Sequence, residues 1–160
     1  MKERFYGRIK GGIKIKLYKK FDYLAYWFRY QATYLEMKYH LTQVINGKEE
    51  YYIKSVGHYD RNIGKSAALA RLSAKYNIPI IVPTEKWKRL IERNIPLNLP
   101  RYFRKRNPTA FVINSNLREL KQKIVLIEEC LTDKQIEKLN CISKGAVVGY
   151  QNHDIQERKW

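Results

Sequence analysis

Five short apolar runs in residues 51–152 constrain the fold more than any other feature of the chain. They are residues 51–56, 78–83, 109–114, 123–129 and 145–151. Helix-like patterns separate several of them. Strands with so little polar content are typical of a parallel sheet that is buried on both faces. We therefore predict an α/β fold with a mainly parallel sheet and helices on both of its faces.

The helix patterns between these runs have recognisable starts. Residues 65–76 place Leu69, Leu72 and Tyr76 on one stripe. Thr84 is a candidate N-cap for a helix that we expect to end before Pro96, with an irregular connection over residues 94–108. Thr132 and Gln135 form a capping box for a helix to about residue 140.

The N-terminal part predicts a strand and then a helix. Residues 12–18 alternate between aliphatic side chains and lysines, Lys14 and Lys16, which predicts a strand with a basic outer face. Those lysines either bind a polyanion or guard a sheet edge against pairing. Asp22 is a candidate N-cap for an aromatic-rich helix to about residue 40. We expect that helix to be covered on most of its circumference, with a base-stacking platform as the alternative.

Asn46-Gly47 predicts the turn of a β-hairpin whose second strand covers residues 51–56. The length of 160 residues indicates a single domain. Within it we expect a basic strand and aromatic helix over residues 1–45, an α/β core over residues 46–152, and a tail over residues 153–160.

Charge is the strongest signal in the composition. Thirty-two Lys and Arg residues face fifteen Asp and Glu residues, a formal net charge of +17. Such a charge favours a polyanionic partner, and nucleic acid, either DNA or RNA, is the partner we expect. Two cysteines, Cys130 and Cys141, and no zinc-like spacing predict a reduced, cytoplasmic setting. The sequence has no secretory pattern and no apolar run of membrane-spanning length.

Two short motifs carry candidate chemistry. Gly64-Lys65-Ser66 follows one predicted strand and opens a helix, which is the setting of a phosphate-binding loop. The run "KIVLIEE" ends in two carboxylates, Glu128 and Glu129, at the end of another strand. The alternative is that neither motif has a chemical role: Lys65 would be a solvated residue at a helix start, and residues 123–129 would be a buried strand whose end reaches water.

Together these motifs resemble the P-loop NTPase superfamily over residues 51–152, and "GKSAALARLSAKYNIPIIVPT" looks like the opening of small phage and helicase-type ATPases. The resemblance implies ATP or GTP with Mg²⁺ as cofactor. It implies phosphate binding by Asn62, Ile63, Gly64, Lys65 and Ser66. It also implies an indirect metal shell at Ser66 and Glu128, and catalysis by Glu128 and Glu129. Gln151 and Asn152 would then sense the γ-phosphate.

The chain departs from the family pattern at two positions. Tyr59 stands where the full motif has its first glycine, and Glu128 stands where aspartate is usual. These departures support a second hypothesis: a catalytically inactive, basic accessory or inhibitor protein. Such a protein would be viral, directed at host defence, and would bind nucleic acid or a nucleoprotein complex. Binding to a membrane surface ranks last, because the helix expected at residues 22–40 has few cations.

A basic loop is the second candidate for nucleic-acid binding, besides Lys14 and Lys16. Its members are Arg101, Tyr102, Arg104, Lys105 and Arg106. Arginine contacts to phosphate together with aromatic stacking suit a nucleic-acid strand. The alternative is a solvated loop.

Overall fold

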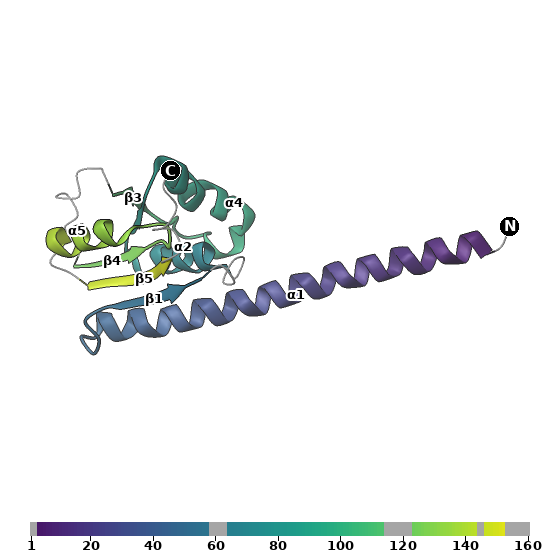
Figure 1. Cartoon of the computed structure of the whole chain (residues 1–160), viewed down its shortest axis with the longest axis horizontal. Helices are drawn as coiled ribbons and strands as arrows, with labels where there is room; N and C mark the ends of the chain where they lie inside the picture. Colours follow the sequence, from purple (N-terminus) through teal and green to yellow (C-terminus); the bar gives the residue numbers. More distant parts are fainter. Residues whose placement is uncertain (1–2, 58–63, 114–122, 144–145, 153–160) are drawn as a thin grey trace.

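The computed structural model describes residues 3–57, 64–113, 123–143 and 146–152. A long helix, α1 (Glu3–Ile45), precedes a sheet domain (Figure 1). The strands are β1 (Tyr52–Val56), β2 (Ile80–Val82), β3 (Ala110–Val112), β4 (Ile124–Ile127) and β5 (Ala146–Asn152). The other helical segments are α2 (Lys65–Tyr76), α3 (Glu85–Arg89), η2 (Leu90–Asn94), α4 (Ile95–Asn98), η3 (Pro100–Tyr102) and α5 (Asp133–Ser143).

All five strands run parallel in the order β1-β5-β4-β2-β3. The prediction of an α/β fold with a parallel sheet is confirmed at this level. Parallel strands bring their carboxyl ends to one edge of the sheet, which is where ligands bind in folds of this type. The start of α2 and the segment after β4 meet at this edge, next to the end of β5.

Two apolar clusters cover the two faces of the sheet. The first combines Ile80, Leu126 and Val148 of the strands with residues of α1, α2 and η2. The second combines Ile81, Val125 and Val147 with residues of α5. Alternate residues of one strand thus enter different clusters, which explains why the runs are apolar throughout.

Close contact between β4 and β5 depends on Gly149. A Cβ atom at this position would lie 2.2 Å from the carbonyl oxygen of Ile127 and 2.6 Å from its Cγ1. Any side chain at position 149 would therefore push the two strands apart. Because Glu128 follows Ile127 directly, this contact also fixes where the two glutamates leave the sheet.

The predicted strand over residues 12–18 is wrong, because these residues belong to α1. This part of α1 extends away from the sheet domain in Figure 1. A strand needs a neighbouring strand for its backbone N–H and C=O groups, whereas a helix satisfies them internally. The alternation of Lys14 and Lys16 with aliphatic residues is too short to outweigh that requirement.

The helix expected from Asp22 is also longer than predicted, since Asp22 lies inside α1. Its docked stripe consists of Tyr30, Tyr34, Met37, Leu41 and Val44, all buried in the first cluster. The expectation of cover around most of the helix is wrong. Exposed apolar side chains on α1 include Tyr23, Leu24, Phe28 and Leu35.

The predicted hairpin at Asn46-Gly47 is wrong. Gly47 has a φ of 70° and ends α1: its N–H donates to Val44 O at 3.1 Å, and Lys48 N–H donates to Gln43 O at 2.9 Å. Hairpin turns and helix C-caps both require a residue with positive φ, so the dipeptide fits either. β1 pairs with β5 in parallel instead, and Lys54 Nζ binds Glu36 of α1 at 2.8 Å.

The helical segment that starts at Thr84 continues past Pro96, contrary to prediction. The Thr84 hydroxyl accepts from Trp87 N–H, as expected of an N-cap. Leu90–Asn94 then forms a π-helical segment, with Ile95 N–H donating to Leu90 O, before α4 begins with Pro96 in its first turn. The missing N–H of proline costs little at that position, so the helical path continues.

Candidate nucleotide site and basic pocket

The N-terminus of α2 lies at the carboxyl edge of the sheet, beside Glu128 and Glu129. Gly64 precedes it with a φ of 81° and, as a glycine, has no side chain that could cap the first turn. The first turn also contains no acidic residue. The partial positive charge of this helix end is therefore not compensated by its own sequence, which favours an anion there.

Lys65 and Glu129 form an ion pair at this edge. The Lys65 Nζ lies 2.9 Å from Glu129 Oε2, and the exposed fractions of the two side chains are 5% and 22%. A lysine this buried is rare without a partner of opposite charge. The pair links the first residue of α2 to the segment after β4.

Ser66 and Glu128 form a second link beside it. The Ser66 hydroxyl donates to Glu128 Oε1 at 2.8 Å. Glu128 is fully buried, and its Oε2 has no hydrogen-bond partner among the described residues. Burial raises the pKa of Glu128 to about 7, while the Ser66 hydroxyl opposes the shift.

The end of β5 lies next to the start of α2 and the segment after β4. Gln151 Nε2 donates to Asp133 Oδ1, and Asn152 N–H donates to Glu129 O at 3.3 Å. Gln151 is thus engaged with α5. A role of either side chain as a γ-phosphate sensor stays a prediction.

The structure brings four of the predicted site residues together: Lys65, Ser66, Glu128 and Glu129. Gly64 adjoins them at the start of α2. Asn62 and Ile63, like Tyr59, lie outside the described residues. Lys14 and Lys16 belong to α1 and not to a strand beside this edge.

Oxygen donors dominate the site. Within the described residues no group of three or more His, Cys, Asp and Glu side chains could hold a metal ion. The Ser66 hydroxyl, the unpartnered Glu128 oxygen and phosphate oxygens would nevertheless fit Mg²⁺, which binds through few carboxylates and keeps several waters.

Cys130 lies beside the two glutamates. Burial and the nearby Glu128 raise the pKa of the Cys130 thiol to about 12, so the thiol remains protonated.

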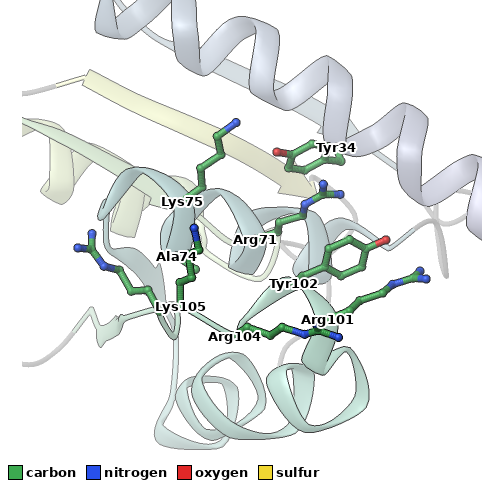
Figure 2. Close-up of a pocket in the computed structure, with 9 residues that line it drawn as sticks. Tyr34, Arg71, Ala74, Lys75, Arg101, Tyr102, Arg104 and Lys105 are labelled. Atoms are coloured by element: carbon green, nitrogen blue, oxygen red, sulfur yellow. The ribbon is translucent and has the colours of Figure 1, made fainter.

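A basic pocket lies on the flank of α2, away from its N-terminus. It has a volume of about 650 Å³. Its lining comprises Tyr34, Arg71, Ala74, Lys75, Arg101, Tyr102, Arg104, Lys105 and Arg106 (Figure 2). The whole predicted basic loop therefore lines one recess, and no carboxylate is among the lining residues.

Arg71 and Lys75 were not predicted as binding residues. They lie four residues apart on α2, and this spacing puts both on one side of the helix. On sequence alone two cations on a helix indicate a solvated face. No spacing in the sequence connects them to the basic loop at residues 101–106, which only the fold brings beside α2.

Comparison with protein-family models, with curated proteins and with solved structures found no match. No helix in the described ranges is long and apolar enough to cross a membrane. The function of the two sites must therefore be argued from their own geometry.

Proposed function

We propose that the chain is a small P-loop-like protein that binds ATP or GTP with Mg²⁺ and acts on or with nucleic acid. The observation that carries the proposal is the pairing of Lys65 with Glu129 and of Ser66 with Glu128. One helix start and one strand end, far apart in the sequence, thereby contribute a cation, a hydroxyl and two carboxylates to one place.

The proposed roles follow from the chemistry of each group. The Lys65 ammonium and the backbone N–H groups in the first turn of α2 would bind phosphate oxygens. The Ser66 hydroxyl and Glu128 would hold the shell of a magnesium ion, which neutralises phosphate charge. Glu129, released from Lys65 by the incoming phosphate, would accept the proton of an attacking water at a carboxylate oxygen.

The apolar surroundings support this assignment. Glu128 is buried at the end of β4, so its charge is poorly solvated in the resting protein. A bound cation would favour the ionised form of a carboxylate whose pKa is raised to about 7. The Oε2 atom of Glu128, which has no hydrogen-bond partner among the described residues, would then face the water shell of that ion.

Isothermal titration with Mg-ATP and Mg-GTP tests the proposal. Lys65→Ala should reduce nucleotide affinity at least 100-fold, because the substitution removes the only proposed side-chain cation. Lys134→Ala, at an exposed position on α5, is the matched control. Unchanged affinity in a folded Lys65→Ala protein would refute nucleotide binding at this site.

The second candidate is an accessory or inhibitor protein that retains the site without turnover. The ion pair favours it, since the Lys65 ammonium already has a carboxylate partner at 2.9 Å. A phosphate-release assay with and without DNA separates the candidates. Release that Glu129→Gln abolishes supports the enzyme. Nucleotide binding without release supports the accessory protein.

A further inference from the structure

We propose that the basic pocket binds single-stranded nucleic acid, with a base stacked on Arg101 and phosphates held by the surrounding cations. This inference gives a location to the nucleic-acid partner and rests on the proposed function only for that partner's identity. The pocket is separate from the nucleotide site, so each can be tested without the other.

The first supporting observation is a stack of alternating cations and rings. The Arg71 guanidinium carbon lies 3.8 Å from the Tyr34 ring centroid and 4.2 Å from that of Tyr102. The Arg101 guanidinium carbon lies 4.7 Å from the same Tyr102 ring. Figure 2 shows Arg71 between the two rings. Arg101 is exposed, so the stack ends in a planar group that a base can cover.

The stack is held in place from three elements. Tyr34 belongs to α1, Arg71 to α2 and Tyr102 to η3. Gln31 Nε2 donates to the Tyr102 hydroxyl at 3.3 Å, which fixes that ring from α1. A planar surface that is ordered before binding loses little conformational entropy when a ligand arrives.

The second observation is uncompensated positive charge. Six cations line the recess: Arg71, Lys75, Arg101, Arg104, Lys105 and Arg106. The salt bridges found among the described residues involve other side chains. Like charges around one recess repel each other, and a strand of phosphates would relieve that repulsion and release its own counterions.

Arg71 also interacts with Tyr30 of α1. Burial raises the pKa of the Tyr30 hydroxyl, and a hydrogen bond and charge interaction with the Arg71 guanidinium oppose that shift. Tyr30 is therefore a second residue of α1, besides Tyr34, that holds the Arg71 guanidinium in the stack.

A single strand fits this recess better than a duplex. A cavity of about 650 Å³ is the size of a pocket that encloses one small ligand. A splayed base with its phosphates can enter such a recess, whereas the bases of a duplex are already stacked on one another. Free polyphosphate shares the anionic chemistry but has no base to stack.

Fluorescence anisotropy without nucleotide or Mg²⁺ tests the inference. The probe is a labelled 12-residue single-stranded oligonucleotide, as DNA and as RNA, with unlabelled duplex and inorganic polyphosphate as competitors. We expect single strands to bind at least about tenfold more tightly than either competitor, because stacking contributes to single-strand binding alone. Equal affinity for polyphosphate, or tighter binding of duplex, would overturn the proposal.

Two double variants locate the site at constant net charge. Arg104→Ala/Lys105→Ala removes two pocket cations, and Lys134→Ala/Lys138→Ala removes two exposed cations of α5, which covers the other face of the sheet. We expect the first pair to lower the slope of log affinity against log salt by about 1.4 and the second to leave it unchanged. Equal losses from both pairs would mean non-specific attraction and would refute the pocket.

Single variants test the stack. Arg101→Ala should weaken single-strand binding about tenfold. Arg71→Lys keeps the charge but not the planar group, and should also weaken binding. For polyphosphate, Arg101→Ala should lower the affinity only by the effect of one lost charge, and Arg71→Lys should leave the affinity unchanged. If Lys65→Ala abolishes oligonucleotide binding while the pocket variants bind normally, the polyanion binds at the nucleotide site, and this inference fails while the proposed function stands.

Discussion

The proposed nucleotide site and the basic pocket both use residues of α2, but their charges are arranged in opposite ways. At the N-terminus of the helix Lys65 is paired with Glu129, and Glu128 is fully buried. On the flank of the same helix, Arg71 and Lys75 face a recess without a carboxylate. Charge in the first region is enclosed and compensated. In the second it is open and unbalanced.

This difference separates stability from binding. Removing one member of an enclosed pair leaves a buried charge without a partner, so the fold bears the cost. Removing one cation from an open recess relieves repulsion, so only the ligand is affected. The four predictions below test this contrast, beginning with the largest expected effect.

Glu129→Ala should lower the free energy of unfolding by about 3 kcal/mol, because it removes the carboxylate that forms an ion pair with the buried Lys65 ammonium. Urea denaturation at pH 7 measures the change. The control is Glu137→Ala, an exposed carboxylate on α5. The double variant Lys65→Met/Glu129→Leu should lose less than Glu129→Ala alone. Equal, small losses from Glu129→Ala and Glu137→Ala would remove the distinction between the two regions.

Stability should fall by about 2 kcal/mol as the pH rises from 5 to 8. The pKa of Glu128 is about 7 in the folded protein and near 4.5 without burial. The folded state therefore holds a proton that the unfolded state releases, and this contribution is lost as the pH passes through 7. Thermal melting across this range should show the fall, and Glu128→Gln should flatten it. A wild-type profile as flat as that of the variant would contradict the raised pKa.

Gly64→Ala should cost about 1 to 2 kcal/mol from its positive φ, plus a further loss from contact with α1. A Cβ at Gly64 would lie 2.9 Å from Tyr30 Cδ2, whereas one at Gly47, also at positive φ, would meet nothing within 4 Å. Gly47→Ala is therefore the matched control for backbone strain. The difference between the two variants in thermal unfolding measures how tightly Tyr30 packs on the start of α2. No difference would mean that this contact has no energetic weight.

Arg104→Ala/Lys105→Ala should leave the free energy of unfolding within about 0.5 kcal/mol of the parent protein, as for other exposed substitutions. Both side chains are exposed at the rim of the pocket. Urea denaturation at low salt is the sensitive condition, because repulsion between cations is screened least there. A loss above about 1 kcal/mol would show that these cations stabilise the fold itself.

The sheet domain could be predicted from sequence because its signals are local and agree with each other. Residues 65–76 carry a single apolar stripe and form α2 over the predicted range, and Thr132 and Gln135 form their capping box, with Thr132 N–H donating to Gln135 Oε1 at 2.9 Å. All five apolar runs form strands, and the central strands β2, β4 and β5 are largely buried on both faces. Because the sheet is parallel, the ends of its strands meet at one edge, and the prediction that Lys65, Ser66, Glu128 and Glu129 lie close together there is confirmed.

The wrong predictions come from sequence patterns that are compatible with two different local structures. Positive φ at Gly47 serves a hairpin turn or a helix C-cap, and only the path of the whole chain decides between them. Alternation over residues 12–18 requires a neighbouring strand, which a sequence does not reveal. Arg71 belongs to a site only because Tyr34 and Tyr102, from two other elements, enclose it. Such a stack has no sequence spacing that would predict it.

The length of α1 has a practical consequence. At 1.5 Å per residue, Glu3 lies about 40 Å along the helix from Tyr30. Tyr30 packs on the start of α2, and its ring centroid lies 5.9 Å from that of Tyr102. In a variant whose Cys130 and Cys141 are replaced by serine, a dye attached through Glu3→Cys would therefore report on distance without touching either region. The efficiency of energy transfer from that dye to a labelled oligonucleotide would measure the distance between them. That distance would differ between a strand bound at η3 and a strand bound elsewhere on the protein.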